Sequence, residues 1–544
     1  MFFHKVHTYP GIRVGIACPA QGPLPPPPTL FGGGRVFPCP LTARPQDAST
    51  PITREFLLDS GTKASYHALL RIRPSASPSR LGEVRWDEEN GELPRVSESE
   101  VPVRVVKSTV ADLAQTLTDA RGRTLALVAD LTDEQLIGPL LPIVNPLLWE
   151  IGHLAWFQEH WVLRRVGGGQ PLLKDADSLY DSARVPHDDR WTLPLPSRID
   201  TLRYMEQVLE RILDRLAHIQ LNEEEIYFHH LATFHEDMHG EAFTYTRQTL
   251  GYPPPSLVTP DAGGCSVADE SGGPCPGDVE IPGGIYMLGG TPDLPFVFDN
   301  EKWQHPVRVR PFRIARAPVT NVDFAKFVDD GGYQRPELWS ESGWAWRDRT
   351  NAKHPVYWQR GPGRSWLRRR YDQIVPLEEH LPVIHVNWHE AQAYCRRADR
   401  RLPTEAEWEM AASSELTLDG QALPTQKRRF PWGNDPPAPD RANLDTRAVG
   451  CIPVNLLAAG DSAFGCRQMI GNVWEWTSDD FGRFPCFTID PYKEYSEPWF
   501  GGTHKVLRGG AFATRSRLIR NSHRNFYTPD RRDVLAGFRT CSLE

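Results

Sequence analysis

The chain lacks several features that would assign it to a familiar class of protein. No apolar run approaches the roughly 18 residues that a membrane helix needs, and the first residues lack the long apolar core of a secretory signal. The formal net charge of -8 gives no overall attraction to nucleic acid or anionic lipid. Nine cysteines scattered over 544 residues do not form the dense disulfide framework of a small secreted domain. These absences predict a cytoplasmic protein that binds neither nucleic acid nor membrane.

A chain of this length is too long for one hydrophobic core, and its texture changes along the sequence. Residues 1–100 are rich in Pro, Gly and Ser, without helical or strand periodicity, and predict a disordered extension. Residues 101–255 have the three- and four-residue apolar spacing of helices, which indicates an antiparallel four-helix bundle. Residues 256–280 are typical of a linker, and residues 281–544 alternate short apolar runs with loops, as in an irregular α+β domain.

Helix signals are clearest at a few termini. Asn145 and Pro146 suit the start of one bundle helix, and Asn222 with Glu225 suits a capping box at the start of another. In the second half, Thr404 and Glu407 form the same pattern. The expected helices are, in the bundle, around 110–128, 146–160, 197–218 and 222–250, and, in the second half, 322–328, 389–398 and one from 404.

The sharpest chemical signal is a histidine pair at helical spacing. His235 and His239 lie four residues apart and therefore share one face of a helix, where both can reach one metal ion. His153, on a tryptophan-rich helix, is the natural third ligand if the two helices face each other. Such pairs also occur on solvated helix faces, but Phe234, Met238 and Phe243 favour a buried one. The pattern predicts a three-histidine metal site with open coordination positions.

The same five residues fit the His-Glu-x-x-His pattern of zinc proteases, in which the glutamate, here Glu236, is the general base. The longer version of that pattern requires a third histidine six residues after the second, where this chain has Tyr245. The protease interpretation is therefore the weaker one.

Over residues 101–544 the chain resembles the ergothioneine-biosynthesis sulfoxide synthases, including their selenoneine-synthase branch. The resemblance rests on the stretch from Asn145 to His153 followed by Trp156 and Phe157, and on the stretch from His235 to His239. It implies a DinB-like bundle that binds iron(II) through His153, His235 and His239, followed by a formylglycine-generating-enzyme-like, C-type-lectin-like α+β domain.

The second half is similar to that domain at five ordered motifs. They are Pro318–Asn321, Arg401–Glu409, Gly471–Trp476, Val506–Gly510 and Ala536–Arg539. Formylglycine generation depends on a cysteine pair shortly after the Arg-Gly-Gly turn, where this chain has Thr514 and Ile519. The resemblance therefore implies a domain that binds substrate over the iron and does not generate formylglycine.

In the family, iron and O2 join a sulfur or selenium donor to the imidazole of hercynine, the trimethylated betaine of histidine. The segment Asn525-Phe526-Tyr527 corresponds to the region where relatives contact hercynine, so these three residues are the expected substrate contacts. Aromatic rings suit a quaternary ammonium through cation-π contact, and Asn525 suits the carboxylate. Trp474 and Trp476 are more simply explained as core residues.

Three departures from the family favour a selenosugar, 1-seleno-glucose, as the donor. Met238 stands where some relatives have a glutamine that contacts substrate. Tyr527 stands where the branch that binds gamma-glutamylcysteine has an acid ahead of a Pro-x-Arg-Arg segment, which here contains Arg531, a further expected substrate contact. The loop after the Trp-Glu-Trp motif has no tyrosine at the position where relatives often have a catalytic one. Tyr492 and Tyr495, further along, are therefore the candidates.

Other interpretations stay open at this level. An ergothioneine-type sulfoxide synthase using gamma-glutamylcysteine or cysteine as the thiol donor is the first alternative, and an ovothiol-type enzyme is the next. DinB-like bundles with three histidines also occur as metal-dependent hydrolases or thiol transferases, which would act without O2. A binding protein with structural histidines is the non-catalytic alternative.

Overall fold

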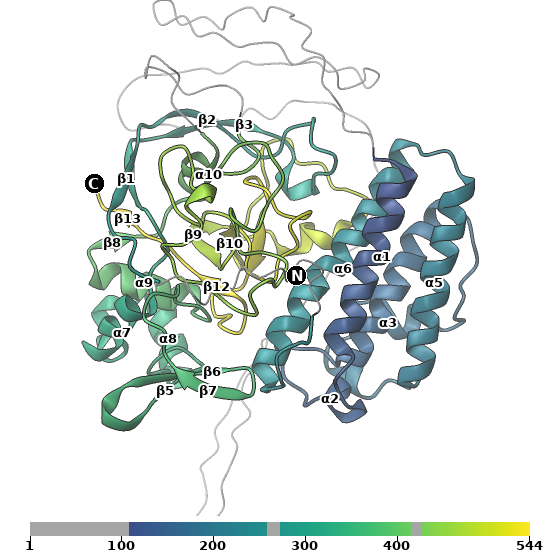
Figure 1. The fold of residues 1–544 in the computed structure, drawn as a ribbon, viewed down its shortest axis with the longest axis horizontal. Helices are drawn as coiled ribbons and strands as arrows, with labels where there is room; N and C mark the ends of the chain where they lie inside the picture. The colour runs from purple at the N-terminus through teal and green to yellow at the C-terminus, as the bar shows by residue number, and fades with distance from the viewer. Residues whose placement is uncertain (1–107, 258–271, 415–426) are drawn as a thin grey trace, which may run out of the picture. The chain divides into compact units, whose positions relative to one another are not determined.

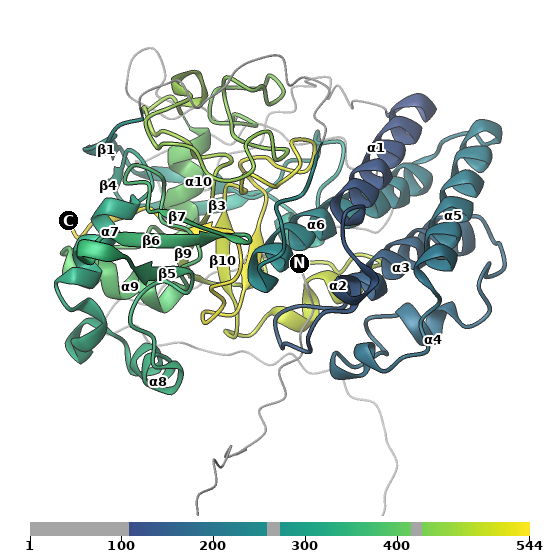
Figure 2. The same cartoon turned by 60° about the horizontal axis from the view of Figure 1, so that its bottom comes forward.

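The computed structural model describes residues 108–257, 272–414 and 427–544. The N-terminal part is helical and the C-terminal part mixes short strands, short helices and loops (Figure 1; Figure 2). The predicted extension and most of the predicted linker lie outside the described residues. The order of a helical bundle followed by an α+β domain is confirmed.

The bundle consists of long helices with short ones between them. Its helices are α1 Val110–Val128, α2 Asp133–Ile137, α3 Leu147–Gln158, α4 Ala176–Tyr180, α5 Arg198–His218 and α6 Glu223–Leu250. A π-helical segment, Glu159–Val166, continues α3. Helices α1 and α6 face each other and make the most extensive helix–helix contact, and α3 packs on α5.

Local sequence explains most of the bundle helix ends, with two differences from the prediction. Asn222 accepts from the backbone N–H of Glu225, but the Glu225 carboxylate pairs with Arg215 and does not complete a capping box. Asn145 does not cap α3, because its side-chain oxygen accepts from Arg190 Nη1 at 2.7 Å, while its amide nitrogen donates to Glu150. At the other end of α6, Gly251 adopts φ 68°, a left-handed conformation that glycine takes without strain.

The C-terminal domain is built from four small sheets. Two have four strands, in the orders β1-β4-β13-β8 and β11-β10-β9-β12, and the others are the pair β2-β3 and the meander β5-β6-β7. The strands are β1 Asp278–Ile281, β2 Gly284–Leu288, β3 His305–Val309, β4 Phe312–Ala315, β5 Trp358–Arg360, β6 Trp366–Arg370, β7 Gln373–Pro376, β8 Arg400–Arg401, β9 Trp474–Asp480, β10 Lys505–Arg508, β11 Asn525–Tyr527, β12 Ala536–Gly537 and β13 Cys541–Ser542. Pairing is antiparallel except between β12 and β9.

Four helices complete this domain: α7 Asn321–Asp329, α8 Glu341–Thr350, α9 Trp388–Arg397 and α10 Glu405–Ser413. The predicted capping box of Thr404 and Glu407 at the start of α10 is confirmed. The three helices predicted from the sequence correspond to α7, α9 and α10, whereas α8 was missed.

Helix α6 belongs to two hydrophobic cores. Phe228 and Phe243 pack in the bundle core, whereas Ala242 and Tyr245 pack in the core of the C-terminal domain. The bundle core in turn includes C-terminal side chains such as Tyr492 and Leu518. The helix that carries two of the candidate ligands is therefore fixed from both sides.

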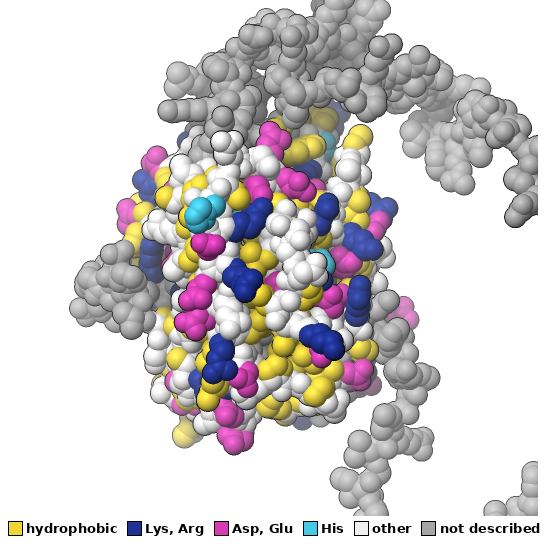
Figure 3. Space-filling view, turned by 90° about the vertical axis from the view of Figure 1, so that its right-hand side faces the viewer, with side chains coloured by type: hydrophobic (Ala, Val, Ile, Leu, Met, Phe, Trp, Pro, Cys, Tyr) yellow, Lys and Arg dark blue, Asp and Glu magenta, His cyan; other side chains and the backbone are white. Residues whose placement is uncertain are grey.

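Within the three described ranges, no helix is both long and apolar enough to cross a membrane. On the face drawn in Figure 3, basic and acidic side chains are interspersed and do not gather into a basic patch.

Candidate metal centre and substrate pocket

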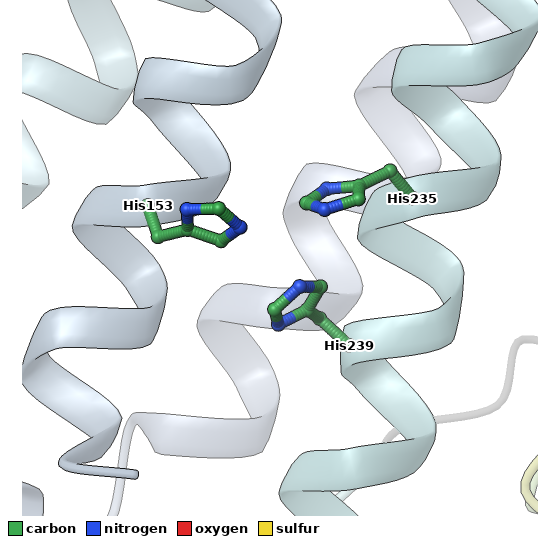
Figure 4. A group of neighbouring side chains, drawn as sticks. All are labelled: His153, His235 and His239. Carbon is green, nitrogen blue, oxygen red and sulfur yellow. The ribbon is translucent and has the colours of Figure 1, made fainter. Parts of the chain in front are cut away.

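Three buried histidines from two helices converge inside the bundle. His153 comes from α3, and His235 and His239 lie one turn apart on α6 (Figure 4). One ring nitrogen of each lies within 4.8 Å of those of the others, and the side chains are at most 4% exposed. The structure therefore brings together the three residues that the spacing singled out.

A backbone carbonyl orients the first of these rings. His153 Nδ1 lies 2.7 Å from the carbonyl oxygen of Tyr180, and because a carbonyl only accepts, Nδ1 carries the proton. This assignment leaves Nε2 with its lone pair for a metal. Gly152 makes the approach possible, since a Cβ there would lie 2.3 Å from the Tyr180 ring.

Burial keeps the three rings neutral. It lowers the pKa of His153 to about 3, and burial followed by the neighbouring histidines lowers the pKa values of His235 and His239 well below the usual range. Neither ring nitrogen of His235 has a hydrogen-bond partner among the described residues, although both are buried. A buried imidazole without a protein partner, beside two others, fits a metal ligand, because a bound ion would supply the missing partner.

The donor set fits iron(II). Three neutral imidazoles bind iron, zinc or copper, and they occupy one part of the coordination sphere while other positions stay available to substrates. Phe157 stacks on the His235 ring at 3.6 Å between centroids and 4° between planes, which fixes the orientation of that ligand.

The glutamate of the protease-like pattern is engaged elsewhere. Glu236 is 1% exposed, and its carboxylate accepts from Arg121 Nε at 2.9 Å and from Gln158. A carboxylate that is held in a buried ion pair is not available as a general base. The protease interpretation gains no support from the structure.

A pocket lies where α6 meets the C-terminal domain. It is lined by Met238, Glu241, Trp474, Leu518, His523, Asn525 and Tyr527. Met238 follows His235 by three residues and Glu241 follows Met238 by three, so Met238 and Glu241 form a stripe of α6 beside the one that carries the two histidines.

Sequence reasoning found three of these lining residues, Met238, Asn525 and Tyr527, and missed the others. Trp474 belongs to the hydrophobic core, as predicted, and also lines the pocket, whereas Trp476 is fully buried and donates to the Val386 carbonyl as a core residue. The clue to Glu241 was its place two residues after a candidate ligand.

Glu241 links the two domains at the wall of the pocket. Its carboxylate accepts from Trp474 Nε1 at 2.6 Å and from the hydroxyl of Thr514. Burial raises the pKa of Glu241, while these two hydrogen bonds oppose the shift. Both of its carboxyl oxygens are thus held at the pocket wall by fixed donors.

Two of the predicted substrate contacts do not line this pocket. Side chains alternate across β11, so Phe526 faces away and stacks on Phe481 at 3.8 Å between centroids. Arg531 makes two hydrogen bonds to Asp533, at 2.6 and 2.7 Å, and stands 5.3 Å from the centre of the Tyr527 ring. Arg531 therefore backs the pocket wall, and the predicted contact of Phe526 with substrate has no support.

The two candidate tyrosines enter the bundle from the C-terminal domain. Tyr492 is edge-on to His235, with 6.2 Å between ring centres, and packs against Phe157 at 5.0 Å. Tyr495 donates to the Met238 sulfur at 3.7 Å. Burial raises the pKa of both phenols well above the usual range, so both stay protonated.

The positions of the formylglycine-generator cysteines have another use here. Thr514 and Ile519 both lie within 4 Å of where a Cβ on Gly510 would be, so they occupy one place in the domain. The hydroxyl of Thr514 holds Glu241, and Ile519 is buried in the hydrophobic core. Neither side chain offers a thiol for copper chemistry.

Comparison with known families agrees with this division. The DinB superfamily matches residues 116–246, and the Sulfatase-modifying factor enzyme 1-like domain matches residues 266–542. Fold and site together define an enzyme in which a DinB bundle with a three-histidine metal centre is joined to a sulfatase-modifying-factor-like domain.

Relatives that span both domains are more specific. The hercynine oxygenases of Mycobacterium tuberculosis and Mycolicibacterium thermoresistibile are 38% and 37% identical to the chain over 430 and 439 residues, which cover 78% and 79% of it and 97% and 94% of those proteins. The chain belongs to the hercynine oxygenase family. The formylglycine-generating enzyme of Thermomonospora curvata is 33% identical over 299 residues, covering 48% of this chain and 92% of that enzyme.

Proposed function

We propose that the protein is an iron(II)- and O2-dependent selenoneine synthase, which joins the imidazole C2 carbon of hercynine to the selenium of 1-seleno-glucose. Membership of the hercynine oxygenase family supports hercynine as one substrate. The reaction removes hydrogen from C2 and from the selenol, and O2 takes up the electrons. Iron(II), held by His153, His235 and His239, supplies the redox chemistry that makes O2 an oxidant.

The pocket has the chemistry that a betaine of histidine requires. A trimethylammonium group cannot donate hydrogen bonds, so it is stabilised by aromatic faces, which Trp474 and Tyr527 offer, and by electron-rich oxygens such as those of Glu241. Asn525 is the neighbouring polar group for the substrate carboxylate. The remaining work of the chain is to hold hercynine and the donor together in one orientation.

The observation that carries the choice of donor is the state of the two arginines after Pro529. Arg531 is buried in a bidentate pair with Asp533, and Arg532 stands 3.8 Å from the carboxylate of Glu390. A donor with two carboxylates, such as gamma-glutamylcysteine, needs cations that are not already neutralised. A neutral sugar needs none, which favours the selenosugar.

We assign the tyrosine nearest the metal centre as the catalytic group. Tyr492 lies against His235 and Phe157, and a protonated phenol there can donate a proton or hydrogen bond near the reacting atoms. Tyr495, which donates to Met238, shapes the pocket instead. We expect Tyr492→Phe to slow product formation by about 100-fold while substrate binding is retained, and Tyr495→Phe to affect binding more than rate.

The proposal is tested by reconstituting the full chain with iron(II) without oxygen and then adding O2, hercynine and one donor. One arm contains 1-seleno-glucose, one contains gamma-glutamylcysteine and one contains cysteine, and the products are identified by mass spectrometry. A selenium conjugate of hercynine is the expected product. A sulfoxide formed only from a thiol donor would overturn the selenium assignment, and turnover without O2 would overturn the oxidative one.

A further inference from the structure

The pocket contains one imidazole that the metal centre does not use. His523 lines the pocket, is 2% exposed and belongs to the segment that leads into β11. Its ring is packed against Phe298, at 5.7 Å between centroids, and against Trp474, at 5.9 Å. It is therefore held in one orientation within the pocket wall.

A buried carboxylate stands behind this ring. His523 Nδ1 lies 3.6 Å from Glu301 Oε1, and the other Glu301 oxygen accepts from the Ser522 hydroxyl at 3.0 Å. Arg520 donates to Glu301 Oε1 at 2.6 Å. Despite complete burial, these partners hold the pKa of Glu301 at about 2, so the carboxylate is ionised.

The charge of Glu301 decides which nitrogen of His523 carries the proton. A lone pair on Nδ1 would face a negative oxygen, whereas an N–H there is attracted to it, so the Nδ1–H tautomer is favoured. Burial lowers the pKa of His523, so the ring is neutral. The remaining nitrogen, Nε2, is then a hydrogen-bond acceptor.

The opposite wall creates the need for such an acceptor. Helix α6 presents the thioether of Met238 to the pocket, and that sulfur is the acceptor for Tyr495. A neutral imidazole substrate has one ring N–H, which needs an acceptor when it is buried. The other α6 residue in the pocket wall, Glu241, already accepts hydrogen bonds at both oxygens, from Trp474 and Thr514, so the C-terminal domain is the better source of a polar contact to the ring.

We propose that His523, held by Glu301, is a positioning residue that accepts a hydrogen bond from the ring N–H of the imidazole substrate. This inference rests on the proposed function, because it concerns how hercynine lies in that site. The contact selects the substrate tautomer in which the ring nitrogen facing His523 carries the proton. It thereby fixes the orientation of the ring and of its C2 carbon. Its specificity extends to imidazoles with a free ring N–H and excludes those methylated at that nitrogen.

The test measures binding, by calorimetry without oxygen, to the iron(II)-loaded full chain. The ligands are hercynine and its two ring-N-methyl isomers, and the proteins are wild type, His523→Phe and Glu301→Gln. We expect His523→Phe to weaken hercynine binding about tenfold, as for the loss of one buried hydrogen bond. The difference between the two isomers should largely disappear in the same variant, and Glu301→Gln should give a smaller change of the same sign.

His504→Phe is the matched control, because His504 is in the same domain, outside the pocket, and contacts Phe526. It should leave all three affinities unchanged. An isomer preference that is the same in wild type and His523→Phe would overturn the inference. If His523→Phe does not fold, His523→Leu, which also lacks an acceptor, decides by the same ratio. Failure of wild type to bind hercynine would instead overturn the proposed function.

Discussion

The two domains place their functional groups in different ways. The bundle presents its ligands from regular helices, where a four-residue spacing alone puts His235 and His239 on one face. The C-terminal domain presents Trp474, His523 and Asn525 from short strands and loops that are fixed by buried ion pairs and hydrogen bonds. Helical periodicity therefore allows the metal centre to be predicted from the sequence. The pocket cannot be predicted in this way, because it depends on contacts between segments that are far apart in the chain.

The largest expected effect is on metal affinity, when one of the ligands on the bundle helices is removed. His239→Ala should lower metal affinity by more than about 100-fold. Loss of a residue that only supports a ligand lowers metal affinity by about 10- to 100-fold, and loss of the ligand itself should cost more. The measurement is metal content after dialysis, together with titration by cobalt(II). His218→Ala, at an exposed position on α5, should retain full metal content. Equal metal content in both variants would remove the basis of the metal centre.

The next effect is on stability and concerns the ion pairs that join the C-terminal domain to α6. Arg517 donates twice to Asp237 at 2.7 Å, and Asp237 is 3% exposed. Arg517→Ala leaves that carboxylate with only Arg515, at 3.8 Å, and should lower the free energy of unfolding by about 3 kcal/mol. Urea denaturation measures the change.

The control for that ion pair is Arg483→Ala, since Arg483 and Glu497 form a pair at 3.4 Å in which both side chains are about half exposed. Its loss should change the free energy of unfolding by less than about 1 kcal/mol. A comparable loss in both variants would mean that burial of the pair is not what matters.

A smaller effect is expected from a single methyl group behind the metal centre. Gly152→Ala would force the Tyr180 ring away and disturb the carbonyl that orients His153. Metal affinity should fall about 10-fold, at the lower end of the range for such supporting groups. Gly122→Ala, where nothing lies within 4 Å of the new Cβ, should leave metal affinity unchanged and stabilise α1 by up to about 1 kcal/mol.

The last effect is a pH dependence of stability within the bundle, which is small over any one pH unit. Burial raises the pKa of Glu150 to about 8, while the Asn145 amide opposes the shift. Between the ordinary carboxyl pKa and about 8, the unfolded chain has lost this proton and the folded chain keeps it, so stability falls as pH rises. The slope from this group is on the order of 1 kcal/mol per pH unit.

Glu150→Gln removes that titration and keeps the shape of the side chain. Its advantage over wild type in urea denaturation should grow from pH 5 to pH 8. A difference that is constant with pH would show that Glu150 is ionised in the folded protein.

Sequence reasoning succeeded where a local pattern determines the geometry. The histidine triad, the α10 capping box and the division into two kinds of domain follow from spacing or from ordered motifs. It failed where the outcome depends on a partner far along the chain. Asn145 was expected to cap α3, but Arg190 donates to its side-chain oxygen. In the same way, no pattern within one segment predicts that Glu301 will stand behind His523.

Helix α6 also has a practical consequence for anyone who wishes to exchange these domains. It supplies two metal ligands, one wall of the pocket and side chains to both cores, so the boundary at Gly251 is not a clean cut point. A chimera that takes its C-terminal half from one relative should inherit α6 from that same relative. A junction placed after the helix would combine the metal ligands of one protein with the C-terminal packing contacts of another.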